Sequence, residues 1–134
     1  MGDQATFSLT TKKDYIYLKT RGGLDEDNVT APTDAAIALA KEKNIRKLLD
    51  NIQEVDFSTA SLSVQAKGMG VLWRLRYFKK VAIVLKGEEA AFLFFSSIQE
   101  LQLGLGHRFQ GFDNEADAVR WLQASPVPAA ERKS

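Results

Sequence analysis

The sequence predicts an α/β domain built on a mixed, mostly parallel sheet with crossover helices, in the order β-β-α-β-α-β-α-β-α. Two β-rich segments separated by a three-residue loop open the chain, which is typical of a hairpin. From about residue 30 onward, helical segments of about 10–15 residues alternate with short β-rich segments, which favours parallel strands joined by right-handed crossovers. Residues 81–85 form a continuous apolar run, as in a central strand buried on both faces.

The length and composition fit one globular domain. The chain has 134 residues, a net charge of +1 and no cysteine. We therefore expect a single domain over residues 1–124, followed by a flexible tail over residues 125–134. The lack of cysteine excludes disulfides and thiol chemistry. The amino-terminal residues lack the apolar core of a signal peptide, and residues 89–105 are interrupted by polar side chains, so we expect a cytoplasmic protein.

The first half of the chain predicts a hairpin, a helix and a strand. Strands are expected over residues 6–9 and 14–20 because both segments are rich in β-formers. Thr30 or Thr33 is expected to cap the following helix, with Pro32 in its first turn. A third strand is expected over residues 46–52, followed by a loop over residues 53–59.

The second half predicts three helices and two strands. The first helix ends near residue 75, and its expected inward positions are Leu62, Ala66, Met69, Leu72 and Trp73. The strand at residues 81–85 should place Val81, Ile83 and Leu85 on one face and Ala82 and Val84 on the other. A helix over residues 89–103, a strand over 107–112 and a helix over 114–123, capped by Asp113, complete the chain.

Two segments carry a resemblance to a known family. They are the basic-then-apolar segment at residues 78–84 and the segment at residues 108–113, which is followed by a closing Ala-x-x-Val-x-Trp-Leu helix. With the predicted element order, they make the chain resemble the STAS domain, and in particular the SpoIIAA-like family of stand-alone STAS-like bacterial proteins. That family in turn resembles Sec14-type lipid-binding domains. The likeness covers about residues 6–123 and implies a STAS-like fold with a non-catalytic, regulatory role.

The resemblance implies a partner-binding loop or phospho-switch at the start of the second helix. Anti-anti-sigma factors carry an Asp-Ser-Ser-Gly stretch there, in which a serine is phosphorylated. The corresponding stretch keeps an acid and hydroxyls but lacks the glycine; its candidate residues are Asp56, Ser58, Thr59 and Ser61. A phosphate at a helix N-terminus gains from free N–H groups and the helix dipole, although simple helix capping explains the same residues.

Residues 57–87 contain no acidic side chain and form a candidate basic patch. Its residues are Lys67, Arg74, Arg76 and Lys79. An anionic surface, a lipid headgroup or an acidic partner could dock there, so that any membrane contact would be peripheral. The alternative is an ordinary solvated surface. No nucleic acid is expected as a partner, because the net charge is small and the sequence has no RNA- or DNA-binding motif.

Phe92, Leu93 and Phe95 form a candidate apolar patch within the helix predicted over residues 89–103. Consecutive apolar residues on a helix point in different directions, so some should face away from the sheet. We expect this patch to support a homodimer. In the alternative of a Sec14-like carrier of an apolar ligand, the patch is the lid of a pocket lined by Met69 and Trp73. Burial in the core is the third interpretation.

No residue pattern indicates catalysis or a metal site. His107 is the only histidine and is accompanied by no cysteine, so it is a poor metal ligand. An enzyme that uses His107 as a base is the least favoured hypothesis. Asp50, Glu54 and Asp56 match no cation-binding loop and fit a solvated acidic turn. The expected function is therefore a non-catalytic regulatory or binding domain without a cofactor, acting on a protein partner or a small ligand.

Overall fold

A computed structural model describes residues 6–23, 25, 29–56, 61–86 and 109–124. In the second helix, the side chains at positions 65, 66, 68, 69, 72 and 73 are not among those described. The elements within these ranges are β1 (Thr6–Thr11), β2 (Ile16–Gly23), α1 (Ala31–Lys43), β3 (Lys47–Asp56), α2 (Leu62–Arg74), the short 3-10 helix η2 (Leu75–Tyr77), β4 (Lys80–Val84), β5 (Phe109–Phe112) and α4 (Glu115–Gln123). The helix predicted over residues 89–103 lies outside the described residues.

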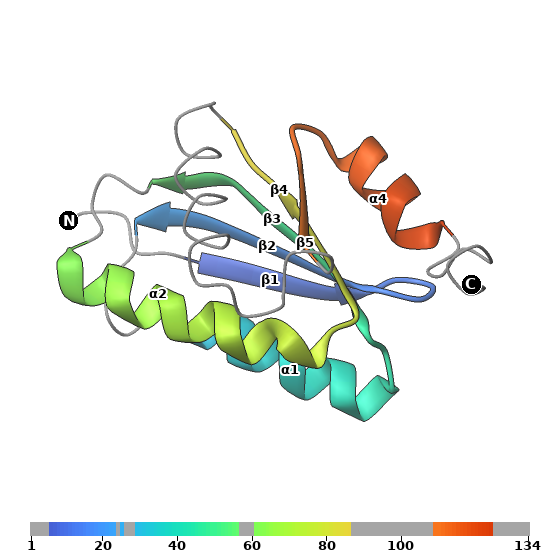
Figure 1. Cartoon of the computed structure of the whole chain (residues 1–134), viewed down its shortest axis with the longest axis horizontal. Coiled ribbons are helices and arrows are strands. Elements are labelled where there is room, and N and C mark those ends of the chain that lie inside the picture. Colours follow the sequence, from blue (N-terminus) through green and yellow to red (C-terminus); the bar gives the residue numbers. More distant parts are fainter. Residues whose placement is uncertain (1–5, 24, 26–28, 57–60, 87–108, 125–134) are drawn as a thin grey trace, which may run out of the picture.

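The strands form one sheet in the order β1-β2-β3-β4-β5. β1 pairs antiparallel with β2, and every later neighbour pair is parallel (Figure 1). The predicted mixed, mostly parallel sheet is therefore confirmed. Because the four parallel strands run the same way, they all begin at one end of the sheet, the amino edge, and finish at the other, the carboxyl edge.

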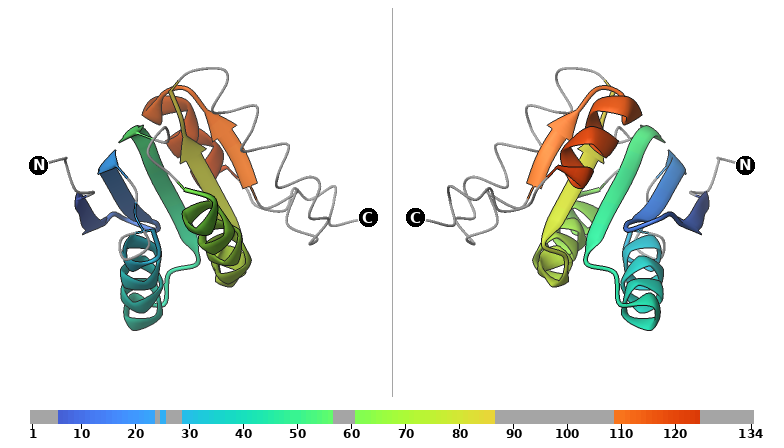
Figure 2. Two further views of the ribbon diagram at one scale, coloured as in Figure 1. Left: turned by 90° about the vertical axis from the view of Figure 1, so that its left-hand side faces the viewer. Right: turned by 90° about the vertical axis from the view of Figure 1, so that its right-hand side faces the viewer.

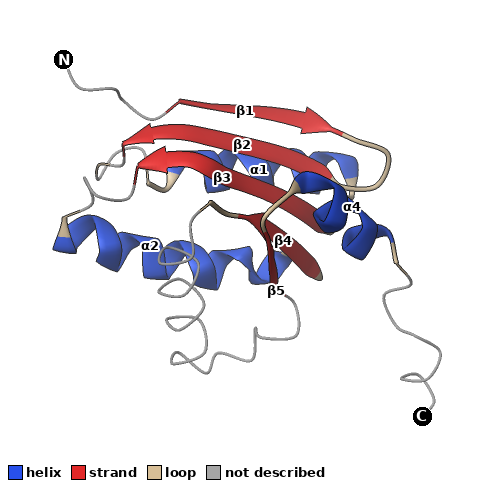
Figure 3. Cartoon of the chain, turned by 90° about the horizontal axis from the view of Figure 1, so that it is seen from above, coloured by secondary structure: helices blue, strands red, loops and turns tan. Residues whose placement is uncertain are grey.

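Helices cover both faces of the sheet (Figures 2 and 3). α1 and α2 lie side by side on one face, and α4 lies on the other. Each helix starts near the carboxyl edge and runs back to the amino edge, as parallel crossovers require. Within the described ranges, no helix is long and apolar enough to cross a membrane.

The central strand β4 divides the core into two clusters, as the sequence predicts. Val81, Ile83 and Leu85 belong to the larger cluster beneath α1 and α2. Ala82 and Val84 belong to a smaller cluster beneath α4. All five side chains are buried, so this alternation confirms a strand that is covered on both faces.

The ends of α1 are determined by local sequence. Thr30 is the N-cap residue, and Pro32 occupies the first turn, where its missing N–H costs nothing. At the other end, Asn44 adopts a left-handed conformation with φ 57°, and its N–H bonds to the carbonyls of Ala40 and Lys41. Asparagine tolerates this conformation better than most residues and therefore ends the helix.

Several element boundaries differ from the prediction. β1 continues to Thr11, and β2 spans Ile16–Gly23 instead of residues 14–20. β3 continues to Asp56, whereas a loop was expected from residue 53, and the N-cap of α4 is Asn114 rather than Asp113. The side chain of Asn114 accepts a hydrogen bond from the N–H of Asp117 at 2.8 Å. Either residue type can cap a helix, so sequence alone does not choose between neighbouring Asp and Asn.

The extra length of β3 depends on an irregularity. Lys19 pairs with Asn51 but Arg21 pairs with Glu54, so β3 carries one more residue than β2 between these rungs. The side-chain oxygen of Asn51 accepts a hydrogen bond from the N–H of Gln53 at 2.9 Å. This local bond satisfies a backbone donor within the bulge and lets the strand continue past it.

Candidate functional site

The predicted partner loop connects β3 to α2 at the carboxyl edge. Asp56 is the last residue of β3, exposed and paired in register with Gly23 of β2. Ser61 directly precedes α2, and its Oγ accepts a hydrogen bond from the N–H of Val64 at 3.2 Å. Ser61 is therefore a helix cap. Ser58 and Thr59 lie outside the described residues. The structure thus brings Asp56 and Ser61 to the same end of the sheet (Figure 1).

Leu62, the first residue of α2, is 83% exposed. The helical spacing groups Leu62 with the inward positions of α2, and the structure contradicts this expectation. Val64, which is 4% exposed, and Val71 pack inward from α2 instead. Leu62 is two positions from Val64, about 200° around the helix, so it lies on the opposite side of the first turn. An apolar side chain in water, next to the Ser61 cap, is the kind of feature that a protein partner covers.

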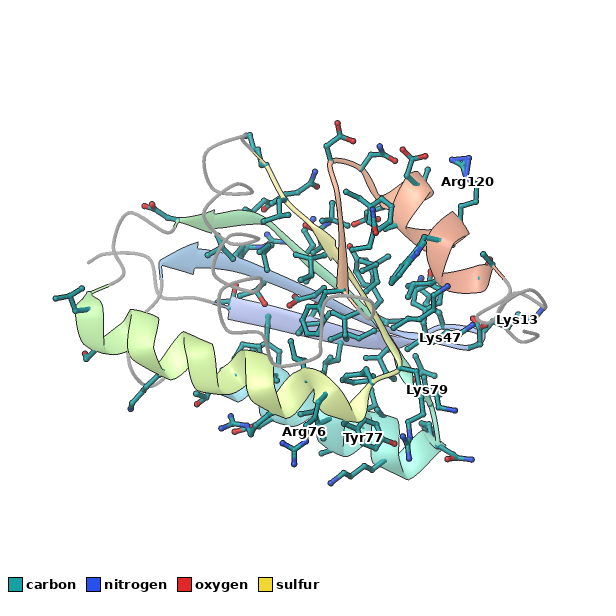
Figure 4. The ribbon with its side chains drawn as sticks, viewed as in Figure 1. Lys13, Lys47, Arg76, Tyr77, Lys79 and Arg120 are labelled. Carbon is teal, nitrogen blue, oxygen red and sulfur yellow. The ribbon has the colours of Figure 1, made fainter. Side chains whose placement is uncertain are left out.

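The four residues of the predicted basic patch do not form one surface with the partner loop. Lys67 and Arg74 are exposed on α2, while Arg76 and Lys79 lie beyond its carboxyl end. A helix of this length spans about 20 Å, so Arg76 and Lys79 lie near the edge opposite Ser61 (Figure 4). Arg74 is also engaged locally, because its Nη2 donates to Asp34 Oδ1 of α1 at 2.6 Å.

The candidate apolar patch and the only histidine lie beyond the part of the chain that the structure describes. Phe92, Leu93, Phe95 and His107 lie outside the described residues, so the dimer, the ligand lid and the histidine base stay predictions. Glu54 contributes to an ion pair instead of a cation site: it lies 3.1 Å from Lys19 Nζ and 3.7 Å from Arg21 Nε. The Lys19 hydrogen bond and charge lower the pKa of Glu54. Among the described residues, no group of three or more potential ligands could hold a metal ion.

A polar network beneath α4 was not predicted. Glu115 Oε2 accepts hydrogen bonds from the Tyr17 hydroxyl and from the side-chain amide of Asn51. Gln53 donates from its side chain to the carbonyl of Asp113 at 3.1 Å. Asn51 is only 1% exposed. These bonds join β2 and β3 to the start of α4. A single asparagine within an apolar strand was the available signal for the network.

The network and its surroundings alter the acidity of two tyrosines. Burial, and then the hydrogen bond to Glu115, raise the pKa of Tyr17 to about 12. Burial is also the main cause that raises the pKa of Tyr15, followed by the charges of Glu115 and Asp14. Both hydroxyls therefore stay protonated at physiological pH. The network joins β2 and β3 to α4 and is suited to holding α4 in place.

The opposite face of β3 carries a different polar group, Asp50. In register it lies between Leu18 of β2 and Ile83 of β4, both members of the larger core cluster. Its Oδ1 is sealed from solvent and has no hydrogen-bond partner within the described part of the chain. This burial raises the pKa of Asp50 to about 7. The solvated acidic turn that the sequence suggested is therefore not what Asp50 forms.

Two solved structures match this arrangement over nearly the whole chain. An anti-sigma factor antagonist from Mycobacterium paratuberculosis aligns with a TM-score of 0.62 and 18% identity, covering 89% of this chain and 94% of its own. An uncharacterized protein from Shewanella loihica PV-4 with a SpoIIAA-like fold aligns at a TM-score of 0.55 and 23% identity over 88% and 93% of the two chains. This chain has a SpoIIAA-like fold.

Comparison with family models gave no match, and comparison with curated proteins gave none either. The fold expected from the resemblance is confirmed by the two structures. At these identities the likeness concerns the fold and leaves the activity open.

Proposed function

We propose that this SpoIIAA-like domain is a non-catalytic regulatory module that binds a protein partner at the carboxyl edge of its sheet. The proposed contact surface consists of Asp56, Ser61 and Leu62, where β3 ends and α2 begins. The observation that carries the proposal is Leu62, which is 83% exposed beside a capped helix start. Burying a leucine side chain on a partner contributes about 1.5–3 kcal/mol, enough to make it an anchor of a modest interface.

Three further observations support binding rather than catalysis. The anti-sigma factor antagonist is, by its name, a protein that counteracts another regulatory protein. The polar network beneath α4 uses its hydrogen bonds internally, between Tyr17, Asn51 and Glu115. The described side chains also include no metal-binding group. A phosphate on Ser61 would replace its cap with a dianion at the same helix N-terminus, which gives the surface a means of regulation.

Affinity capture from the native host tests this surface. The full chain serves as bait in three forms: wild type, Leu62→Asp, and the matched control Ala38→Asp on the exposed side of α1. We expect at least one protein to be retained by the wild type and the control but lost from Leu62→Asp, and to bind the purified wild-type chain directly. If all three baits retain the same proteins in equal amounts, the surface has been assigned incorrectly.

The carrier hypothesis needs a separate experiment, since it depends on Phe92, Leu93 and Phe95. Native mass spectrometry of the purified chain detects a copurified apolar ligand as an added mass. A stoichiometric lipid adduct would replace the protein-binding proposal with a carrier function. A bare chain that still captures a partner would support the regulatory proposal.

A further inference from the structure

Positive charge is concentrated at the amino edge of the sheet, opposite the proposed partner surface. Half of the chain's 18 basic residues lie there. This basic edge consists of Lys12 and Lys13 in the β1–β2 turn, Lys41 and Lys43 at the end of α1, Arg46 and Lys47 at the start of β3, Arg76 in η2, and Lys79 and Lys80 at the start of β4. Figure 4 shows Lys13, Lys47, Arg76 and Lys79 along this end.

Local carboxylates neutralise little of this charge. Asp14 and Glu42 are the acidic residues described at the same end. Asp14 lies 3.2 Å from Lys47 Nζ. Lys13, Lys43 and Lys79 are exposed and form no ion pair within the described ranges. The nearly neutral net charge of +1 therefore conceals a strongly polarised molecule.

The fold itself does not require this arrangement. Lys47 of β3 and Lys80 of β4 are partners in register, and like charges placed directly opposite each other destabilise a sheet. The backbone bond from Lys79 N to Arg46 O, at 2.7 Å, brings two more cationic residues together at the same strand ends. Several members have local roles, since Lys80 donates to the carbonyl of Trp121 at 2.5 Å and Lys47 pairs with Asp14. The exposed Lys13, Lys43 and Lys79 have no ion pair within the described ranges, and these charges are better explained by an external anion than by packing.

We propose that the basic edge docks on a membrane surface that carries anionic lipid headgroups. A cluster of this many lysines and arginines at a bilayer surface is sufficient for electrostatic attachment. Lysines dominate the basic edge, and each is a point charge without a fixed binding geometry, which suits headgroups at varied positions. The charges come from separate turns, helix ends and strand ends, so they cover the whole end of the molecule instead of lining a groove.

The same surface is poorly suited to nucleic acid. Single-stranded binding needs aromatic rings on which bases can stack. The rings of Tyr77, Trp121 and Tyr17 at this end are half-buried, and each is covered by a cation of the basic edge: Arg46 lies 4.5 Å and Lys41 5.7 Å from the Tyr77 centroid, Lys80 4.4 Å from that of Trp121, and Lys12 5.7 Å from that of Tyr17. Acidic residues at the carboxyl edge, such as Asp56 and Asp113, would orient the molecule with its basic edge toward the membrane. The proposed partner surface would then face away from the lipid.

Vesicle sedimentation with the full chain tests this assignment. Vesicles of phosphatidylcholine with about 30% phosphatidylserine are compared with pure phosphatidylcholine vesicles at about 0.1 M salt. We expect wild-type protein to sediment only with the anionic vesicles and to be released at about 0.5 M salt, where screening shortens the range of the charges. Sedimentation with neither vesicle, or equally with both, would overturn the proposal.

Two charge-matched triple variants locate the binding surface. Lys13→Glu, Lys43→Glu and Lys79→Glu together should weaken vesicle binding by at least about 100-fold, since each reversal removes an attraction and adds a repulsion. The control combines Arg21→Glu, Lys67→Glu and Lys86→Glu, three exposed residues away from the basic edge that change the net charge equally, and should lose less than about fivefold. Circular dichroism establishes that both variants fold. Equal losses in the two variants, or binding to RNA or an acidic peptide in place of vesicles, would contradict a membrane-docking edge.

Discussion

The two faces of the sheet are held by different forces. Beneath α1 and α2, the large apolar cluster contains Phe78, Leu48 and Ile83, and Asp50 on the same face lacks a partner for Oδ1 among the described residues. Beneath α4, the apolar cluster is smaller, and a hydrogen-bonded network around Glu115 supplements it. The comparison teaches that burial stabilises the first face, whereas the second face needs specific polar contacts to fix a short helix.

The largest loss of stability should come from a truncation in the apolar cluster beneath α1 and α2. Ile83→Ala is expected to lower the free energy of unfolding by about 2–5 kcal/mol, because Ile83 is buried in the larger cluster and its truncation leaves a cavity. Val84→Ala, one residue along and on the α4 face, removes fewer atoms from a smaller cluster and should cost less. Urea melts measure both. A loss under about 1 kcal/mol for Ile83→Ala would contradict a central position for β4.

Loss of the side-chain amide of Asn51 should destabilise the face beneath α4. Asn51→Ala is expected to cost about 2 kcal/mol, because the Gln53 N–H in the bulge loses its side-chain acceptor and the Glu115 carboxylate keeps only the Tyr17 hydroxyl of its two donors. The matched control is Gln123→Ala at the exposed end of α4, which should stay within about 0.5 kcal/mol of the wild type. If Asn51→Ala is as stable as the control, packing alone holds α4 in place.

Replacing Asp50, the neighbour of Asn51, should raise the free energy of unfolding instead of lowering it. Burial raises the folded-state pKa of Asp50 to about 7, above the ordinary value of an unfolded aspartate. The folded state therefore binds this proton more tightly, so the contribution of Asp50 is favourable below about pH 4 and is lost as the pH rises through 7. Asp50→Asn should match the wild type near pH 4 and be more stable at pH 8 by about 4 kcal/mol, at about 1.36 kcal/mol for each unit between the unfolded and folded pKa.

Unfolding measured across this pH range, in wild type and Asp50→Asn, checks the expectation. The difference between the two proteins should grow with pH. A variant that is less stable than the wild type at pH 8 would show that the Asp50 carboxylate has a stabilising partner.

The fold could be predicted from sequence because its signals are local and repetitive. The run at residues 81–85 has no polar position, which identifies a strand buried on both faces, and the alternation of segments implies parallel crossovers. The boundaries were harder to predict. β3 passes its expected end because the Asn51 side chain supports a bulge, and such a bond is not visible in an apolar pattern.

The candidate site was only partly predictable. Ser61 was recognised because capping depends on nearby residues, and the structure places its Oγ on the N–H of Val64. The exposure of Leu62 was missed because helical periodicity groups apolar positions but does not say which of them meets the sheet, and in the first turn that residue is Val64. The Tyr17–Glu115–Asn51 network joins three elements far apart in sequence, so no spacing rule could assemble it.

Photo-cross-linking in the native host tests the central claim, a protein-binding surface at the carboxyl edge, most directly. A photoreactive amino acid replaces Leu62 in one variant and Ala38, on the exposed side of α1, in the other. We predict a covalent adduct to one defined protein from position 62 that is absent from position 38, with thermal melts unchanged in both variants. No adduct from position 62, or the same adducts from both positions, would contradict the account.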